Sequence, residues 1–235
     1  MSETILAIEQ IETFIGQFHI LEGVAFAVPK GSITVILGRN GAGKTTTLRS
    51  IMGLTPIKNG TIRFEGRDIS RLRPYNIAQL GIGYVPEHRA IFRDLTVEEN
   101  LRIAERSNGD FANRSEFIFD LFPDLKRFYR LPGGSLSGGQ QQMLAVARGL
   151  VPENRLLLID EPSEGLAPVI IEGMMAAIQQ LSTYTTVLLV EQNFRMASQL
   201  GQQYIIIEEG KSVAQGRMAD LANDPALIQR YLGAA

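Results

Sequence analysis

Glycines and a lysine near the start of the chain have the spacing of a phosphate-binding loop. The segment reads Gly38-Arg39-Asn40-Gly41-Ala42-Gly43-Lys44-Thr45-Thr46. Glycine lets backbone N–H groups approach phosphate oxygens, and a helix that begins near Lys44 would point its positive end at them. We expect Lys44 to reach the β- and γ-phosphates of a nucleotide and Thr45 to hold Mg²⁺. The alternative is a glycine turn before a helix that binds nothing.

A second glycine-rich segment, Leu136-Ser137-Gly138-Gly139-Gln140, opens a helical stretch that runs to Leu150. The Ser137 side chain and the N–H groups of the two glycines would lie at the N-terminus of that helix. Such a terminus can hold an anion without any lysine. The plain alternative is a glycine-rich helix cap.

Two acids follow an apolar run in Leu156-Leu157-Leu158-Ile159-Asp160-Glu161. An unpaired carboxylate at the end of a buried strand would be costly unless it served a cation or a reaction. Many strands end in acids, so this pattern alone is weak evidence for a functional site. It indicates one here because a phosphate-binding loop precedes it in the chain.

The composition narrows the classes of protein. The net charge over 235 residues is −2, so no basic field covers the surface as a duplex-DNA binder usually needs, and we expect no nucleic-acid partner. Because cysteine is absent, disulfides, thiolate zinc sites and cysteine nucleophiles are excluded, and a reducing cytoplasm suits the chain. The sequence has no signal-peptide pattern and no apolar run approaching about 18 residues. We therefore expect any link to a membrane to come through a partner.

Short apolar runs alternate with helix-period stretches, which favours an α/β fold with βα units around a largely parallel buried sheet. The predicted core strands are 33–37, 155–159 and 186–190. Ligands of such sheets bind beyond the carboxyl ends of the strands, and the first strand feeds directly into the phosphate-binding loop. The alternating segments that predict a small antiparallel β-subdomain are 5–10, 23–28 and 61–65. From Thr96 to Leu150 the pattern is helical, with Thr96 as a predicted N-cap and Glu99 three residues on.

Together the two glycine-rich segments resemble those of the nucleotide-binding subunit of an ATP-binding-cassette (ABC) transporter, and the resemblance covers essentially the whole chain. It implies a P-loop NTPase core with a mostly parallel sheet, an antiparallel β-subdomain and an inserted helical lobe. The whole of 1–235 would form a single ABC ATPase domain. Its core with the β-subdomain would cover about 1–95 and 151–235, and its helical lobe about 96–150.

The resemblance also assigns roles to individual residues. Asp160 matches the acid that holds Mg²⁺ through water, and Glu161 matches the one that polarises the attacking water. In the family, the segment Ser137 to Gln140 faces the γ-phosphate held by the opposite subunit, so two chains meet head to tail with two ATP molecules between them. The segment Ser163 to Pro168 matches a loop that contacts the partner's site.

Three positions depart from the commonest family pattern. Glu87 stands where glutamine is usual; it can still approach Mg²⁺ but cannot donate a hydrogen bond when ionised. Gln192 replaces a switch histidine and offers no titratable proton. Ile15, with Phe14 beside it, stands where an aromatic side chain normally stacks on adenine, so we expect loose selectivity for the base.

Three short segments specify a subfamily: Val85-Pro86-Glu87, Gly165-Leu166-Ala167-Pro168 and Val190-Glu191-Gln192-Asn193. Their combination is similar to one ATPase of the two-ATPase importers for branched-chain amino acids, which have relatives for urea and other amides. The resemblance implies a Mg²⁺-dependent ATPase that lies on the cytoplasmic face of the plasma membrane as a peripheral subunit. Its partners would be integral-membrane permease subunits, a homologous but different ATPase, or a second copy in a homodimer, and indirectly a periplasmic binding protein. Because it lacks the histidine, this chain's own site would hydrolyse more slowly than its twin.

Permease contacts are expected in the segment from Glu87 to Thr96; the alternative is an ordinary loop anchored in the core by Ile91 and Phe92. Two other functions stay open. A soluble ABC ATPase acting on DNA repair or ribosomes would carry long coiled-coil insertions or two tandem cassettes, and the sequence has neither. A regulatory ATP-binding module with little hydrolysis is disfavoured by Lys44, Asp160 and Glu161.

Overall fold

A mostly parallel sheet forms the centre of the computed structural model, which describes residues 3–233. Within those residues its six strands follow the order β10-β9-β3-β8-β7-β6, and only β10 runs antiparallel to its neighbour. The strands are β3 (Ile33–Leu37), β6 (Ile82–Val85), β7 (Leu156–Asp160), β8 (Thr186–Val190), β9 (Gln203–Glu208) and β10 (Lys211–Arg217). The predicted mostly parallel sheet is confirmed.

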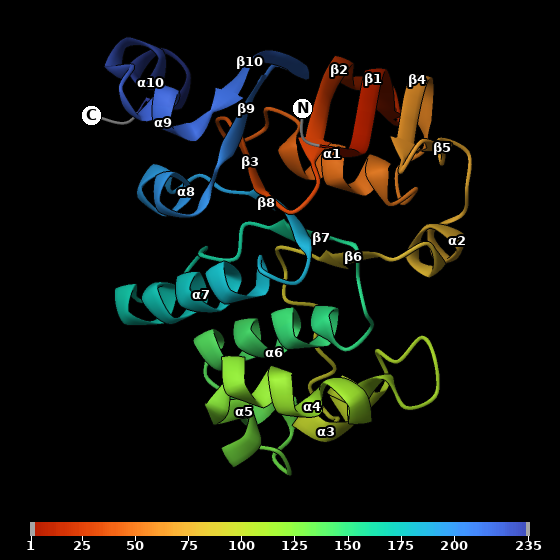
Figure 1. The fold of residues 1–235 in the computed structure, drawn as a ribbon, viewed down its shortest axis with the longest axis vertical. Helices are drawn as coiled ribbons and strands as arrows, with labels where there is room; N and C mark the ends of the chain where they lie inside the picture. The colour runs from red at the N-terminus through yellow and green to blue at the C-terminus, as the bar shows by residue number, and fades with distance from the viewer. Residues whose placement is uncertain (1–2, 234–235) are drawn as a thin grey trace.

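The central strands are buried on both faces, which explains their continuous apolar runs. Side chains alternate across the sheet, so each strand contributes to two cores. In β3, Ile36 packs into a core shared with helix α1 (Lys44–Ile51) and the second sheet, whereas Val35 and Leu37 pack into a core shared with helices on the other face. The helix that follows the phosphate-binding loop is therefore held between two sheets (Figure 1).

The second sheet is antiparallel, with the strand order β2-β1-β4-β5 among the described residues. Its strands are β1 (Thr4–Ile15), β2 (Phe18–Pro29), β4 (Ile57–Phe64) and β5 (Arg67–Asp68). The predicted β-subdomain is present, but its first strand continues past the expected end at residue 10. The alternation breaks there because Gln10 adopts a positive φ of 48° and the register shifts between Ile8 and Ile11, as in a β-bulge.

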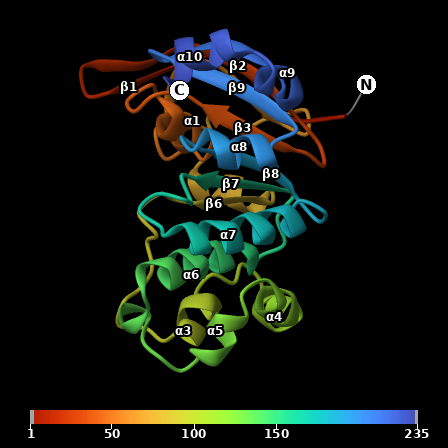
Figure 2. The ribbon, with the colours of Figure 1, turned by 90° about the vertical axis from the view of Figure 1, so that its left-hand side faces the viewer.

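Helices from the middle of the chain gather at the end of the molecule opposite β1, β2 and α10 (Figures 1 and 2). They are α3 (Val97–Arg102), α4 (Asp110–Leu121), α5 (Pro123–Arg127), the 3₁₀ turn η1 (Gly133–Ser135) and α6 (Gly138–Leu150). The predicted cap is present: the Thr96 hydroxyl accepts from the Glu99 N–H, and Glu99 accepts from the Thr96 N–H. The division into a core and a lobe at about 96–150 stays a prediction.

The remaining helices are α2 (Pro74–Gln79), α7 (Pro168–Leu181), α8 (Phe194–Leu200), α9 (Met218–Ala222) and α10 (Pro225–Leu232). Helix α2 and the edge strand β6 were not among the predicted elements, because their runs are short. Across residues 3–233, none of the helices combines the length and the apolar character needed to cross a membrane.

Candidate nucleotide site

The phosphate-binding loop connects the carboxyl end of β3 to the first turn of α1. Gly38 and Gly43 have positive φ values of 149° and 106°. A Cβ atom on Gly38 would collide with the Ile207 carbonyl oxygen, and one on Gly43 would lie 2.8 Å from Leu21 Cδ2. Ile207 belongs to β9, and the turn between β9 and β10 also holds the loop through a hydrogen bond of 2.9 Å that the Gly210 N–H donates to the Ala42 carbonyl. Only glycine fits where the loop presses against its neighbours.

The Lys44 side chain lies inside the loop and is 4% exposed. Its Nζ donates to the Gly38 carbonyl at 3.0 Å and to the Arg39 carbonyl at 3.1 Å, and it lies 3.3 Å from Glu161 Oε1. An ammonium group held by one carboxylate and two carbonyls is well placed to exchange a neighbour for a phosphate oxygen, because phosphate is a strong acceptor for charged donors. The chemistry of this loop fits a nucleotide phosphate.

Asp160 occupies the carboxyl end of β7 and is fully buried. Its Oδ1 accepts from Thr45 Oγ1 at 3.1 Å and its Oδ2 from the Tyr84 hydroxyl at 3.2 Å. Burial raises the pKa of Asp160 above its ordinary value, although these two hydrogen bonds oppose the rise. A hydroxyl beside a carboxylate supplies oxygen ligands that suit Mg²⁺, which normally takes its other ligands from phosphates and water. No cluster of three or more His, Cys, Asp or Glu side chains suited to a metal occurs within the described part of the chain.

Glu161 and Gln192 meet across the ends of two neighbouring strands. Glu161 is 8% exposed, has a positive φ of 45°, and donates its backbone N–H to the Val190 carbonyl at 3.0 Å. Gln192 Nε2 donates to Glu161 Oε2 at 2.5 Å, while the other carboxylate oxygen faces Lys44. The carboxylate is thus oriented from both sides, as a base that must face one particular water molecule requires. A positive φ strains the backbone of a residue other than glycine, so the surrounding contacts must hold Glu161 in this conformation.

A pocket of about 390 Å³ brings most of the predicted site residues together. Its walls are formed by Ile15, Ile20, Asn40, Gly41, Gly43, Lys44, Thr45, Thr46, Glu87, Glu161, Glu164 and Gln192. Gly38, Arg39, Ala42 and Asp160 do not line this pocket. Gly38, Ala42 and Asp160 are buried, Arg39 is exposed, and Asp160 is connected to the wall through its hydrogen bond with Thr45. Burial and a hydrogen bond with Glu164 raise the pKa of Glu87. The pocket therefore combines a phosphate cradle with several carboxylates.

The end of the pocket near Ile15 is aliphatic. Ile15 is 49% exposed, and Ile20 lies beside it in the pocket wall. The neighbouring Phe14 ring stacks on His19 with ring centroids 4.1 Å apart, and Lys58 Nζ lies 4.6 Å from the Phe14 centroid. Phe14 is thus engaged with residues outside the pocket wall, whereas Ile15 lines the pocket. That Ile15 contacts a base stays a prediction.

The second glycine-rich segment lies away from this pocket, at the N-terminus of α6. Ser137 Oγ accepts from the Gln140 N–H at 3.3 Å, and Gln140 Oε1 accepts from the Ser137 N–H at 2.9 Å. Both the cap and the predicted helix start are present. Since Ser137, Gly138, Gly139 and Gln140 contribute nothing to the pocket wall, this chain does not bring them to its own phosphate-binding loop.

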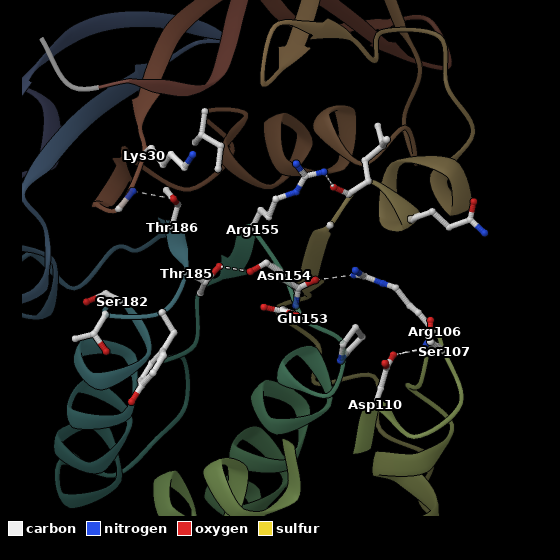
Figure 3. A pocket seen from close by; sticks show the side chains of 18 residues that line it. Lys30, Arg106, Ser107, Asp110, Glu153, Asn154, Arg155, Ser182, Thr185 and Thr186 are labelled. Atoms are coloured by element: carbon white, nitrogen blue, oxygen red, sulfur yellow. Dashed lines mark hydrogen bonds between the residues drawn. The ribbon is translucent and has the colours of Figure 1, made fainter. Parts of the chain in front are cut away.

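A wider pocket of about 770 Å³ lies at the opposite end of β7 (Figure 3). Its polar groups are largely bonded to neighbouring protein atoms: Arg106 Nη2 donates to Asn154 Oδ1 at 2.7 Å and to the Ile82 carbonyl at 3.0 Å, and Arg155 Nη2 donates to the Leu80 carbonyl at 2.5 Å. This pocket faces the amino ends of the parallel strands and contains none of the predicted site residues. Ligands of such sheets bind at the carboxyl ends, so the smaller pocket is the better candidate.

Sequence comparison agrees with this geometry. The family model described as "ABC transporter" matches residues 21–164. The chain belongs to the ABC transporter family. Among its relatives, a Pseudomonas aeruginosa protein named "High-affinity branched-chain amino acid transport ATP-binding protein BraG" is 39% identical over 97% of this chain and 99% of its own length. An Archaeoglobus fulgidus protein named as a probable branched-chain amino acid transport ATP-binding protein, LivF, is 37% identical over 87% of this chain and 89% of its own length.

The ABC fold is found again among solved structures. A crystal structure of the ADP conformation of MJ1267, an ATP-binding cassette of an ABC transporter, superposes with a TM-score of 0.86 and 25% identity, covering 99% of this chain and 100% of that one. As a member of this family, the chain is an ATP-binding ATPase subunit that energises transport. The expected P-loop NTPase fold is confirmed.

Sequence reasoning missed several residues of this ABC site. Tyr84 reaches Asp160 because β6 pairs with β7 in parallel register, which no local pattern reveals. Ile20 joins Ile15 in the pocket wall because the β1–β2 hairpin folds back beside the loop. Glu191 was noted only as part of a short segment, although it is 1% exposed. An acid directly after an apolar strand was the available signal for it.

Proposed function

We propose that this chain energises the import of branched-chain amino acids. The observation that carries the proposal is its 39% identity over 97% of its length to a protein named for that transport activity. The convergence of Lys44, Glu161 and Gln192 on one pocket supports active hydrolysis rather than a purely regulatory role.

Within the pocket we assign phosphate binding to the loop 38–46 and to Lys44. Thr45 and Asp160 would hold Mg²⁺, and Glu87, which lines the same pocket as Thr45, would be a further ligand. The bound ion would neutralise charge on the β- and γ-phosphates. Glu161 would accept a proton from the attacking water, and Gln192 would hold that carboxylate in place.

We propose that two ATPase chains close head to tail, because Ser137 and Gly138 lie apart from their own chain's pocket and would serve the partner's γ-phosphate. The partner is a homologous but different ATPase. Permease subunits would contact the segment from Glu87 to Thr96, at the cytoplasmic face of the membrane. In that segment Ile91 packs against the core, which fixes the segment to the rest of the domain. Phe92 is 45% exposed, with the Arg148 guanidinium over its ring, and so offers an accessible surface to a permease.

The decisive experiment is purification of the tagged chain from its native membrane, combined with uptake assays in cells lacking it. We expect a permease and a second, homologous ATPase to copurify, and uptake of labelled leucine to be lost while that of an unrelated solute is kept. Loss of urea or amide uptake with normal leucine uptake would move the assignment to the amide importers. Recovery of ribosomes or DNA instead would refute a role in transport.

Restoring a histidine at position 192 should accelerate hydrolysis. In the assembled complex, Gln192→His is expected to raise the turnover number by about tenfold, because imidazole can accept and donate a proton that the amide cannot. Phosphate release under saturating ATP measures this. Gln199→His, on an exposed part of α8, is the matched control. Unchanged turnover in Gln192→His would show that the missing histidine does not limit this site.

An aromatic side chain at position 15 should tighten binding of the base. Ile15→Tyr is expected to lower the KM for ATP about fivefold, because base–aromatic stacking is worth roughly 1–3 kcal/mol. Comparing ATP with GTP, CTP and UTP in wild type and in Ile15→Leu tests the expected loose selectivity. Competition between ATP and the other nucleotides measures the selectivity of the wild type. A preference for ATP of about 100-fold or more would contradict a purely aliphatic contact to the base.

A further inference from the structure

Glu191 is a buried carboxylate that lies behind the nucleotide pocket rather than in its wall. It follows β8 and is 1% exposed. Its Oε2 accepts from Ser163 Oγ at 3.0 Å, from the Gln192 N–H at 3.1 Å and from the Asn193 N–H at 3.2 Å, and its Oε1 accepts from the Ser163 N–H at 3.3 Å. Four donors from two separate loops therefore converge on one side chain.

These contacts link the two loops that lie on either side of the Glu161 carboxylate. The first loop leads from Glu161 through one residue to Ser163, and the second carries Gln192. The loops meet a second time where Gln192 Nε2 donates to Glu161 Oε2 at 2.5 Å, and the Glu161 N–H is bonded to the end of β8. The Glu191 carboxylate bonds to Ser163 on the first loop and to the backbone of Gln192 on the second, and Glu191 does not line the pocket.

A carboxylate at this depth is costly for the fold unless donors replace its water. Burial raises the pKa of Glu191 to about 7, and its hydrogen bonds oppose that rise. An apolar residue would fill the space without this desolvation cost. Such a group is explained better by a need to hold its donors in fixed positions than by packing alone.

We propose that Glu191 is a positioning residue that holds the loop of Glu161 and the loop of Gln192 in one fixed relation. The proposal rests on the roles assigned above to those two side chains. Glu191 acts through Ser163 and through the backbone of residues 192 and 193, and it does not itself line the pocket in which the phosphates would bind. Its loss should therefore affect the rate of the chemical step more than the binding of ATP.

The test measures kcat and KM for ATP in the complex recovered through a tag on this chain. Glu191→Ala is expected to lower kcat about 10- to 100-fold, the effect of misplacing a reacting group by about 1 Å, while KM changes less than about threefold. Ser163→Ala, at a partly exposed position, removes one donor and should lower kcat about tenfold, whereas Ser163→Thr keeps the hydroxyl and should retain activity. The double variant should be no slower than Glu191→Ala, because both changes break one network.

Asn154→Ala is the matched structural control. Asn154 is 8% exposed, bonds Arg106 and the Gly149 carbonyl, and lies at the far end of β7 (Figure 3). The Asn154→Ala variant should have a lower thermal stability than the wild type but the same kcat. An unchanged kcat in Ser163→Ala, a raised KM as the main effect of Glu191→Ala, or an equal loss of kcat in Asn154→Ala would overturn the proposal. Full turnover in Glu161→Gln would overturn the assignment of Glu161 as the base, on which this proposal rests. If Glu161→Gln is inactive but the Glu191 and Ser163 variants behave as wild type, only the positioning role of Glu191 fails.

Discussion

Glu161→Gln should reduce ATP hydrolysis by about 100- to 10,000-fold, the range over which a positioned general base accelerates a reaction. The amide preserves the shape of the side chain, but it cannot accept a proton from water. It can still take the hydrogen bond that Gln192 donates to Glu161 Oε2, so the loops around the site should keep their positions. Phosphate release measures the loss, and binding of a fluorescent ATP analogue should persist.

The appropriate control for this variant is Glu172→Gln. Glu172 is an exposed carboxylate on α7, outside the nucleotide pocket, and the same change of charge there should leave turnover unaltered. Retained turnover in Glu161→Gln would remove Glu161 from the role of base. Loss of nucleotide binding together with turnover would instead indicate that Glu161 supports the loop rather than the reaction.

Lys44→Ala should weaken ATP binding about 10- to 100-fold, because each hydrogen bond from a charged donor contributes roughly 1.5–3 kcal/mol. The structure adds a second expectation. Without the ammonium, the Glu161 carboxylate, 3.3 Å away, stays buried with no ion partner, which should lower the free energy of unfolding by on the order of 3 kcal/mol. Equilibrium binding and urea denaturation measure the two effects separately.

The two effects of Lys44 can be separated by a second substitution. In the double variant Lys44→Ala with Glu161→Gln, most of the lost stability should return because no charge is left unpaired, whereas ATP binding should remain weak. Lys211→Ala, which breaks an exposed ion pair with Glu22, should change neither quantity. Normal ATP affinity in Lys44→Ala would contradict its assignment to the phosphates.

Local patterns predicted the parts of the fold that are locally determined. The runs at 33–37 and 186–190 match β3 and β8 residue for residue, because a strand buried on both faces must be continuously apolar and ends where polar groups begin. The cap at Thr96 was equally readable, since its donors and acceptors lie within four residues. The loop 38–46 was identified by glycine spacing, which reflects backbone geometry rather than distant contacts.

The contacts that complete the site depend on strand order and register, which no local pattern contains. Tyr84 meets Asp160 across 76 positions of sequence, and Ser163 meets Glu191 across 28. Each pair meets because two strands that are distant along the chain lie side by side in the sheet. The departure at Ile15 was visible in the sequence, but the engagement of Phe14 by His19 and Lys58 required the folded hairpin.

The attachment of the phosphate-binding loop to the β9–β10 hairpin has a thermodynamic consequence. Gly38 is pressed against the Ile207 carbonyl, and Ala42 is tied to Gly210, so the loop is already shaped before any phosphate arrives. Freezing a flexible segment costs about 1–2 kcal/mol for each residue. Because the contacts with the β9–β10 hairpin already order the loop when the protein folds, nucleotide binding should cost little further backbone entropy. More of the free energy of the phosphate contacts is then available to stabilise the association of two subunits.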